Sequence, residues 1–152
     1  MALKAGDPAP DFALDDQHGK GIKLSDFRGK KVILYFFPRA DTPGCTTQAC
    51  SLRDSRDALD TAGATVIGIS PDKPEAQAKF DTKYGLGFTL LSDPDHAVAD
   101  AYGAWGERSM YGKKYMGIVR SAFVIDERGI VVEPLYKISP KDTVPKALKA
   151  LG

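Results

Sequence analysis

The residues Phe36-Phe-Pro-Arg-Ala40-Asp-Thr-Pro-Gly-Cys45-Thr-Thr-Gln-Ala-Cys50 contain both cysteines of the chain and join an apolar run to a helix start. The run at 32–37 is apolar throughout and rich in β-branched and aromatic residues, which predicts a strand buried on both faces at the centre of a sheet. Pro38 ends this strand because it has no amide to donate to a neighbouring strand. Thr42, followed by a proline, is the expected N-cap of a helix. The sequence therefore predicts Cys45 in the first helical turn after the central strand.

Outward from this stretch, apolar runs alternate with helical patterns along the chain. We expect an N-terminal hairpin from residues 9–14 and 22–24, a helical turn at 25–29, strands at 64–70 and 88–91, and helices from 42 to 63, 75 to 84 and 93 to 102. Residues 103–117 carry several glycines and aromatics without a steady period, which predicts a long loop. A second hairpin at 120–135 and a helix at 143–151 complete the chain. This order predicts an α/β fold with a central mixed sheet and helices on both faces.

The composition limits the class of protein. A length of 152 residues fits a single domain spanning 1–152, and 43% hydrophobic with 27% charged residues is ordinary for a globular protein. The net charge of +1 gives no reason to expect a nucleic-acid partner. The first residues lack the apolar core of a signal peptide, and no later run approaches a membrane span. We therefore expect a cytoplasmic protein with no membrane association, in which two cysteines are more often catalytic, redox-active or metal-binding than structural.

Cys45 is a candidate nucleophile. A cysteine in the first turn of a helix lies near free backbone amides and the positive end of the helix dipole, and both favour the thiolate. Arg39 and Arg120 are candidate cations beside it, and the Thr42 hydroxyl lies on the same turn. If Thr42 caps the helix, its oxygen accepts from the Cys45 amide, and its proton stays free for a bound oxygen. The alternative is that Cys45 is an inert apolar residue and Thr42 only a cap.

The spacing of Cys45 and Cys50 predicts a change of conformation on oxidation. Residues five apart in an ideal helix have Cα atoms roughly 8.7 Å apart, whereas a disulfide tolerates about 4.4 to 6.8 Å. The helix must therefore unwind before the two sulfurs can join. This disfavours a structural disulfide, and with His18 and His96 distant in sequence a zinc site, or any other metal or cofactor site, is not expected.

Four segments, which together extend over nearly the whole chain, resemble the Q-type peroxiredoxins, also called bacterioferritin comigratory proteins. Residues 42–54, Thr-Pro-Gly-Cys-Thr-Thr-Gln-Ala-Cys-Ser-Leu-Arg-Asp, are similar to the active-site helix of this family. Residues 6–12 resemble its opening, residues 32–38 its central strand and residues 120–126 its late strand. Pro38, Thr42 and Cys45 form the signature P-x-x-x-T-x-x-C, and a second cysteine five residues later strengthens the match. Gln48 stands where many relatives have glutamate.

The resemblance implies a thioredoxin-like fold and a peroxidase. Cys45 would be the peroxidatic cysteine and Cys50 the resolving one, Thr42 and Arg120 would hold and polarise the peroxide, and Pro38 would shield the thiolate. The expected substrates are hydrogen peroxide and small organic hydroperoxides, and the expected reductant is thioredoxin or a similar dithiol. A monomer is expected because both cysteines lie on one segment.

Two other functions compete with the peroxidase. A disulfide oxidoreductase shares the fold, but it requires a C-x-x-C pair that the chain lacks. A redox-switched binding module would use the same unwinding to expose a partner surface. The rings of Tyr102, Trp105, Tyr111 and Tyr115 are either a partner-docking patch or partly buried anchors of the expected loop. Tyr35, Phe36 and Phe37 are expected to pack in the core.

Overall fold

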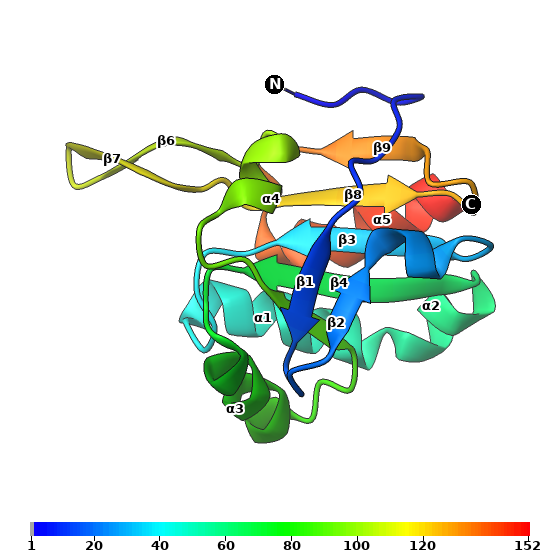
Figure 1. The fold of residues 1–152 in the computed structure, drawn as a ribbon, viewed down its shortest axis with the longest axis horizontal. Coiled ribbons are helices and arrows are strands. Elements are labelled where there is room, and N and C mark those ends of the chain that lie inside the picture. Colours follow the sequence, from blue (N-terminus) through cyan, green and yellow to red (C-terminus); the bar gives the residue numbers. More distant parts are fainter. Residues whose placement is uncertain (1) are drawn as a thin grey trace.

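A computed structural model describes residues 2–152 and contains a seven-stranded mixed sheet (Figure 1). Its strands are β1 (Ala13–Asp16), β2 (Gly21–Lys23), β3 (Lys31–Phe36), β4 (Ala64–Ser70), β5 (Thr89–Ser92), β8 (Ser121–Ile125) and β9 (Val131–Leu135). Their order across the sheet is β2-β1-β5-β4-β3-β8-β9. The neighbours β3, β4 and β5 run parallel, and the outer pairs are antiparallel. The predicted mixed sheet is confirmed, and the strand predicted at 32–37 is an interior strand, β3, next to the middle strand β4.

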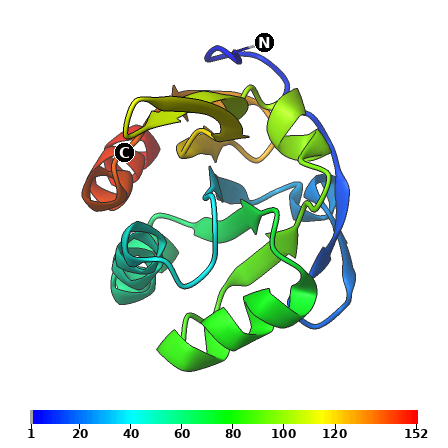
Figure 2. The same ribbon diagram turned by 90° about the vertical axis from the view of Figure 1, so that its left-hand side faces the viewer.

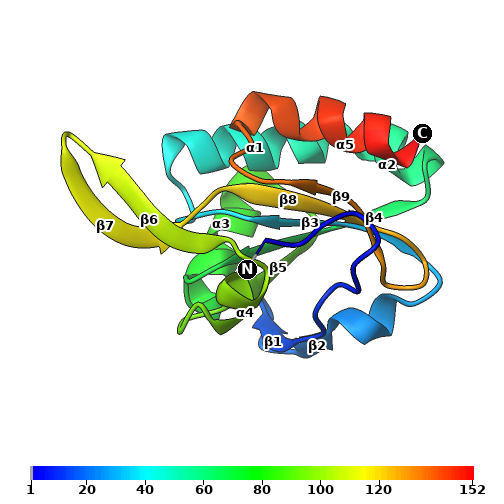
Figure 3. The same cartoon turned by 90° about the horizontal axis from the view of Figure 1, so that it is seen from above.

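Helices cover both faces of the sheet, as predicted (Figures 2 and 3). The helices are α1 (Pro43–Asp54), α2 (Arg56–Thr61), α3 (Pro74–Tyr84), α4 (Ala97–Ala101) and α5 (Thr143–Leu151), with short 3-10 helices η1 (Leu24–Phe27) and η2 (Pro140–Asp142). Helices α1, α2 and α5 lie together on one face, and α4, η1 and the N-terminal segment lie on the other. Because successive residues of a strand point to opposite faces, β3 contributes to two separate apolar clusters.

Strand β3 and the residue after it divide their aromatic side chains between these clusters. Tyr35 and Phe37 pack in the cluster that also contains Cys45, and Phe36 packs in the opposite one. All three are fully buried, so the prediction that they are core residues is confirmed.

The prediction of a loop at 103–117 is wrong. The segment forms most of a separate two-stranded sheet, β6 (Trp105–Met110) and β7 (Lys113–Ile118), which projects from the body (Figure 1). The turn at Tyr111-Gly112 has two successive residues at positive φ, 52° and 78°, as a tight hairpin turn requires. A sequence-based prediction misses these strands because they project into solvent and carry no apolar alternation.

The aromatic residues of this region fall into two groups. Tyr102 is fully buried, and Trp105 stacks on His96 with ring centroids 3.6 Å apart. Tyr111 is 98% exposed and Tyr115 is 43% exposed. The first two are therefore anchors, and the last two belong to the free part of the hairpin.

Three expected boundaries also change. The helix predicted from 42 to 63 is two helices, because it is interrupted at Ser55. The first strand begins at Ala13 rather than at residue 9. The helix predicted from 93 begins after His96, whose backbone is left-handed, and the Asp93 carboxylate accepts hydrogen bonds from the amides of Val98 and Ala99 at 3.2 and 2.9 Å. The second hairpin, β8 with β9, and the final helix are confirmed.

Candidate active site

Side chains of α3 and of the segment after β4 hold the turn between β3 and α1 in place. Pro38 lies half-buried shortly after β3. The amide of Ala40 donates to the Asp72 carboxylate at 2.7 Å, and Asp41 accepts hydrogen bonds from Lys83 Nζ at 2.9 Å and from the Tyr84 hydroxyl at 2.7 Å. Asp41 has φ of 60°, a left-handed conformation that is uncommon for residues other than glycine. These bonds tie the turn that precedes Cys45 to α3 and to the end of β4.

Cys45 lies where the sequence places it, in the first turn of α1 with Thr42 as N-cap. Its side chain is 1% exposed and packs against the core. Nη2 of Arg120, which precedes β8, donates a hydrogen bond to Cys45 Sγ at 3.4 Å. The contact follows from the antiparallel pairing of β3 with β8, which sets Phe36 opposite Ser121. The other candidate cation, Arg39, has an exposed side chain.

Gln48 is part of this site, and sequence reasoning assigned it no role. It is fully buried, accepts a hydrogen bond from Arg120 Nη1 at 2.7 Å and donates one from Nε2 to Thr143 Oγ1 at 2.9 Å. Thr143 in turn donates to the carbonyl of Ser139 at 3.0 Å. Gln48 is three residues from Cys45, so the two share one helix face, and this spacing was the available signal.

The predicted hydrogen bond from the Cys45 amide to the Thr42 side chain does not form. Thr42 occupies the N-cap position but has no side-chain capping bond, and its hydroxyl donates to the carbonyl of Arg39 at 2.8 Å. The left-handed Asp41 folds the chain back on itself, so the hydroxyl meets the carbonyl three residues earlier. The hydroxyl proton is therefore occupied, and the oxygen of Thr42 remains available as an acceptor.

Cys50 lies half-buried in the same helix, and both cysteines are free thiols. Helix α1 is continuous from Pro43 to Asp54 and includes both. The prediction that the helix is intact in the thiol form is confirmed.

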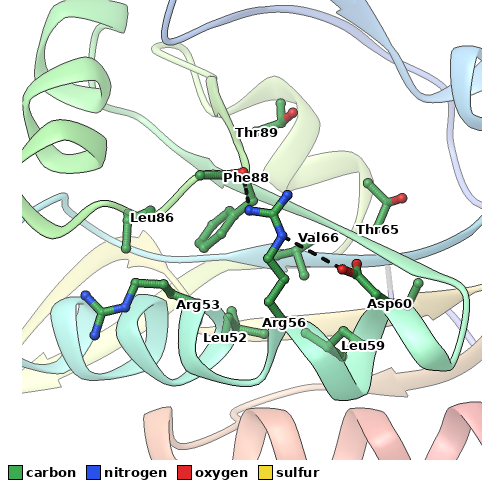
Figure 4. Close-up of a pocket in the computed structure, with 12 residues that line it drawn as sticks. Leu52, Arg53, Arg56, Leu59, Asp60, Thr65, Val66, Leu86, Phe88 and Thr89 are labelled. Atoms are coloured by element: carbon green, nitrogen blue, oxygen red, sulfur yellow. Dashed lines mark hydrogen bonds and ion pairs between the residues drawn. The ribbon is translucent and has the colours of Figure 1, made fainter.

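The end of α1 is anchored separately. Arg53 Nη1 donates to the carbonyl of Tyr84 at 2.6 Å, which joins α1 to the end of α3. Beyond it, Arg56 lies between Asp60 and the carbonyl of Gly87 and lines a cavity of about 210 Å³ (Figure 4). Neither cysteine lines this cavity. The helix is therefore held after Cys50 independently of the contacts at Cys45.

Tyr35 is a buried neighbour of Cys45. Its hydroxyl has no hydrogen-bond partner within residues 2–152. Burial raises the pKa of Tyr35 strongly, and Cys45 adds to the increase while Arg120 opposes it. The phenol therefore stays protonated at neutral pH.

Residues 2–152, which the structure describes, contain no candidate metal centre and no candidate membrane-spanning helix. No group of three or more histidine, cysteine, aspartate or glutamate side chains in this range is placed to hold a metal ion. None of the described helices combines the length and apolar character needed to cross a membrane.

A buried thiol at a helix start, in contact with a guanidinium, defines a candidate thiol-based redox site. The family model that matches residues 5–133 is the AhpC/TSA family, and the chain belongs to that family. A putative peroxiredoxin bcp of Haemophilus influenzae is 54% identical over 140 residues, which cover 92% of this chain and 90% of the relative. Peroxiredoxin Bcp of Escherichia coli K12 is 56% identical over 127 residues, 84% of this chain and 81% of the relative.

Solved structures of peroxiredoxin relatives have the same fold as this chain. Peroxidoxin BcpB of Mycobacterium tuberculosis has a TM-score of 0.87 at 37% identity, and the match covers 98% of this chain and 96% of that one. Peroxiredoxin Q of Xanthomonas campestris has a TM-score of 0.86 at 34% identity, and the match covers 92% of this chain and 89% of that one. The thioredoxin-like peroxiredoxin fold is confirmed, and the relatives support a thiol peroxidase.

Proposed function

We propose that this protein reduces hydrogen peroxide and small organic hydroperoxides through Cys45 and is recycled through an intramolecular bond between Cys45 and Cys50. The observation that carries the proposal is the hydrogen bond from Arg120 to Cys45 Sγ at 3.4 Å. A positive charge at this distance favours a thiolate, and the thiolate is the nucleophilic form of cysteine.

In the first step, the Cys45 thiolate attacks the terminal oxygen of the hydroperoxide. The S–O bond forms as the O–O bond breaks, the sulfur is oxidised to a sulfenic acid, and the peroxide is reduced to an alcohol or water after taking up a proton. Arg120 and the free amides of the first helical turn stabilise the departing oxyanion. Thr42 accepts the O–H of the incoming hydroperoxide with its free lone pair, and Pro38 shields the thiolate from solvent.

In the second step, the Cys50 thiol condenses with the sulfenic acid, which releases water and forms a disulfide. This requires α1 to unwind between the two residues, because the intact helix holds them beyond disulfide distance. An external dithiol, for which thioredoxin is our prediction, then reduces the disulfide by thiol exchange. That the protein acts as a cytoplasmic monomer stays a prediction.

Stopped-flow kinetics with Cys45→Ser and Cys50→Ser variants test the proposal. Cys45→Ser should abolish rapid peroxide consumption, whereas Cys50→Ser should complete one turnover and then fail to be recycled by thioredoxin. Mass spectrometry of the oxidised wild type should show the bond between Cys45 and Cys50. Full activity in Cys45→Ser would falsify the mechanism, and a wild-type rate equal to that of an unrelated free thiol would favour the redox-switched binding module.

A further inference from the structure

A cavity of about 380 Å³ lies beside Arg120, between the base of the projecting hairpin and the segment before η2. Val119, Ile138 and Pro140 provide its apolar lining. Its volume falls within the range of small-molecule sites, roughly 300 to 1,000 Å³. Hydrogen peroxide alone would leave most of this space unfilled.

The cavity adjoins the reactive sulfur. Arg120 lines it and also contacts Cys45 Sγ. Pro140 lines it as well, and a Cβ atom added to Gly44 would lie 3.6 Å from Pro140 Cγ and 3.2 Å from Arg120 Nη2. The first turn of α1 therefore lies against two of the side chains that line the cavity.

The charged lining of the cavity is predominantly positive. Its lining includes three cationic side chains, those of Arg108, Arg120 and Lys137, and one carboxylate, that of Glu107. Glu107 is already paired with Lys114, with 3.4 Å between Oε1 and Nζ. The excess positive charge favours an anionic group in the space that the cations surround.

Backbone groups next to Arg120 hold the guanidinium of Arg108 and the main chain beside Lys137. Arg108 Nη1 donates to the carbonyl of Ile118 at 2.7 Å, which fixes its guanidinium at the base of the hairpin. Lys137 has φ of 53°, and the next residue, Ile138, donates its amide to the carbonyl of Arg120 at 3.0 Å. A lysine in a left-handed conformation is unfavourable by itself and tends to occur where function requires it.

We propose that this cavity receives the organic part of a hydroperoxide and that the preferred organic substrates carry a carboxylate, which Lys137 and Arg108 bind. This inference rests on the proposed peroxidase function. The hydroperoxide would reach Cys45 past Arg120, the apolar part of the substrate would pack on Val119 and Ile138, and the carboxylate would lie at the cationic rim.

The test compares two hydroperoxides that differ by one carboxylate, 4-(2-hydroperoxypropan-2-yl)benzoate and cumene hydroperoxide. In the wild type, kcat/KM should be higher for the carboxylate by about fivefold, the effect of one partly shielded charge contact. Lys137→Asn removes the charge with a residue that tolerates the left-handed backbone, and the ratio of the two kcat/KM values should fall toward one. Arg108→Gln should also lower this ratio. Lys137→Arg, which keeps the positive charge, should leave the ratio at its wild-type value.

Lys20→Asn is the matched control, because it removes the same charge from an exposed turn between β1 and β2. Its ratio should equal that of the wild type. The alcohol product, 4-(2-hydroxypropan-2-yl)benzoate, provides a second readout without turnover. It should bind to Cys45→Ser protein in a calorimetric titration and bind several-fold more weakly when Lys137→Asn is added.

A wild-type ratio of one, or a ratio that Lys137→Asn leaves unchanged, would overturn the inference. In either case, rapid consumption of hydrogen peroxide by the wild type would show that the proposed function stands without it. If the wild type consumed hydrogen peroxide no faster than a free thiol does, both the proposed peroxidase function and this inference would be wrong.

Discussion

The guanidinium of Arg120 donates a partly buried hydrogen bond to the side-chain amide oxygen of Gln48, with 2.7 Å between Nη1 and Oε1. The other terminal nitrogen of the same guanidinium contacts Cys45. Because the guanidinium is planar, fixing one nitrogen also fixes the direction of the other. Gln48 therefore acts as a positioning residue, and α5 supports it through Thr143.

The first prediction concerns this pair. Gln48→Ala should lower the rate of Cys45 oxidation by hydrogen peroxide about 10- to 100-fold, because a small displacement of Arg120 misplaces its contact with the sulfur. It should also lower the free energy of unfolding by about 1 to 3 kcal/mol, since buried polar partners lose their hydrogen bonds. Stopped-flow fluorescence and denaturant unfolding measure the two effects.

Gln48→Glu is the comparison variant, because it keeps an acceptor for Arg120. Its oxidation rate should stay within about threefold of the wild type, consistent with the small context-dependent spread of hydrogen-bond energies. A Gln48→Ala protein that reacts as fast as wild type would contradict the positioning role.

Gly44→Ala should separate stability from activity. Alanine is the better helix former by up to about 1 kcal/mol, but its Cβ would lie 3.2 Å from Arg120 Nη2. We expect unchanged or slightly higher stability and a peroxide reaction slowed by about tenfold as Arg120 shifts. Gly21→Ala, where an added Cβ meets nothing within 4 Å, should leave the reaction unchanged. Equal peroxide reaction rates for the two variants would show that a Cβ atom at position 44 does not disturb Arg120.

Hydrogen exchange should locate the unwinding of α1. In the thiol form the Thr46 amide donates to the carbonyl of Thr42 at 2.8 Å, and the helix continues to Asp54. After oxidation, the amides of residues 46–50 should lose protection, whereas those beyond Arg53 should keep it because of the bond to Tyr84. Cys50→Ser treated with one equivalent of peroxide should keep the protected pattern. Retained protection at 46–50 in disulfide-bonded protein would refute the unwinding.

The contact of Asp41 with α3 should make stability depend on pH. The hydrogen bonds from Lys83 and Tyr84 lower the pKa of Asp41 below its usual value. A lowered carboxyl pKa stabilises the fold above the unfolded value of about 4, and this contribution is lost as the pH falls through the folded value. Asp41→Asn, which tolerates the left-handed backbone, should therefore lower Tm at pH 7, and the difference should shrink below about pH 4.

Thermal unfolding from acidic to neutral pH measures this effect. Asp15→Asn, at an exposed position of β1, controls for the general loss of a carboxylate. A Tm difference for Asp41→Asn that stays constant over the whole range would show that its charge is not involved.

The error at residues 103–117 shows what a sequence pattern detects. Apolar periodicity reports burial, so the buried strands β3, β4 and β8 were predicted closely. Strands β6 and β7 project from the body and expose Met110 and Met116 by more than half. With no core to face, they carry no alternation, and only their mutual pairing defines them.

Local patterns in the sequence are enough to predict strand β3, the helix that Thr42 precedes and the positions of both cysteines, because burial, capping and proline chemistry act locally. The five-residue spacing also predicts that the helix must open for a disulfide to form. The surroundings of Cys45 depend instead on how distant segments pack. Pairing of β3 with β8 brings Arg120 to the sulfur across 75 positions, and packing of α5 on α1 supports Gln48 through Thr143. The backbone of one turn directs the Thr42 hydroxyl to the carbonyl of Arg39 and not to the amides of α1. Contacts of this kind depend on how distant segments pack, which no local pattern in the sequence records.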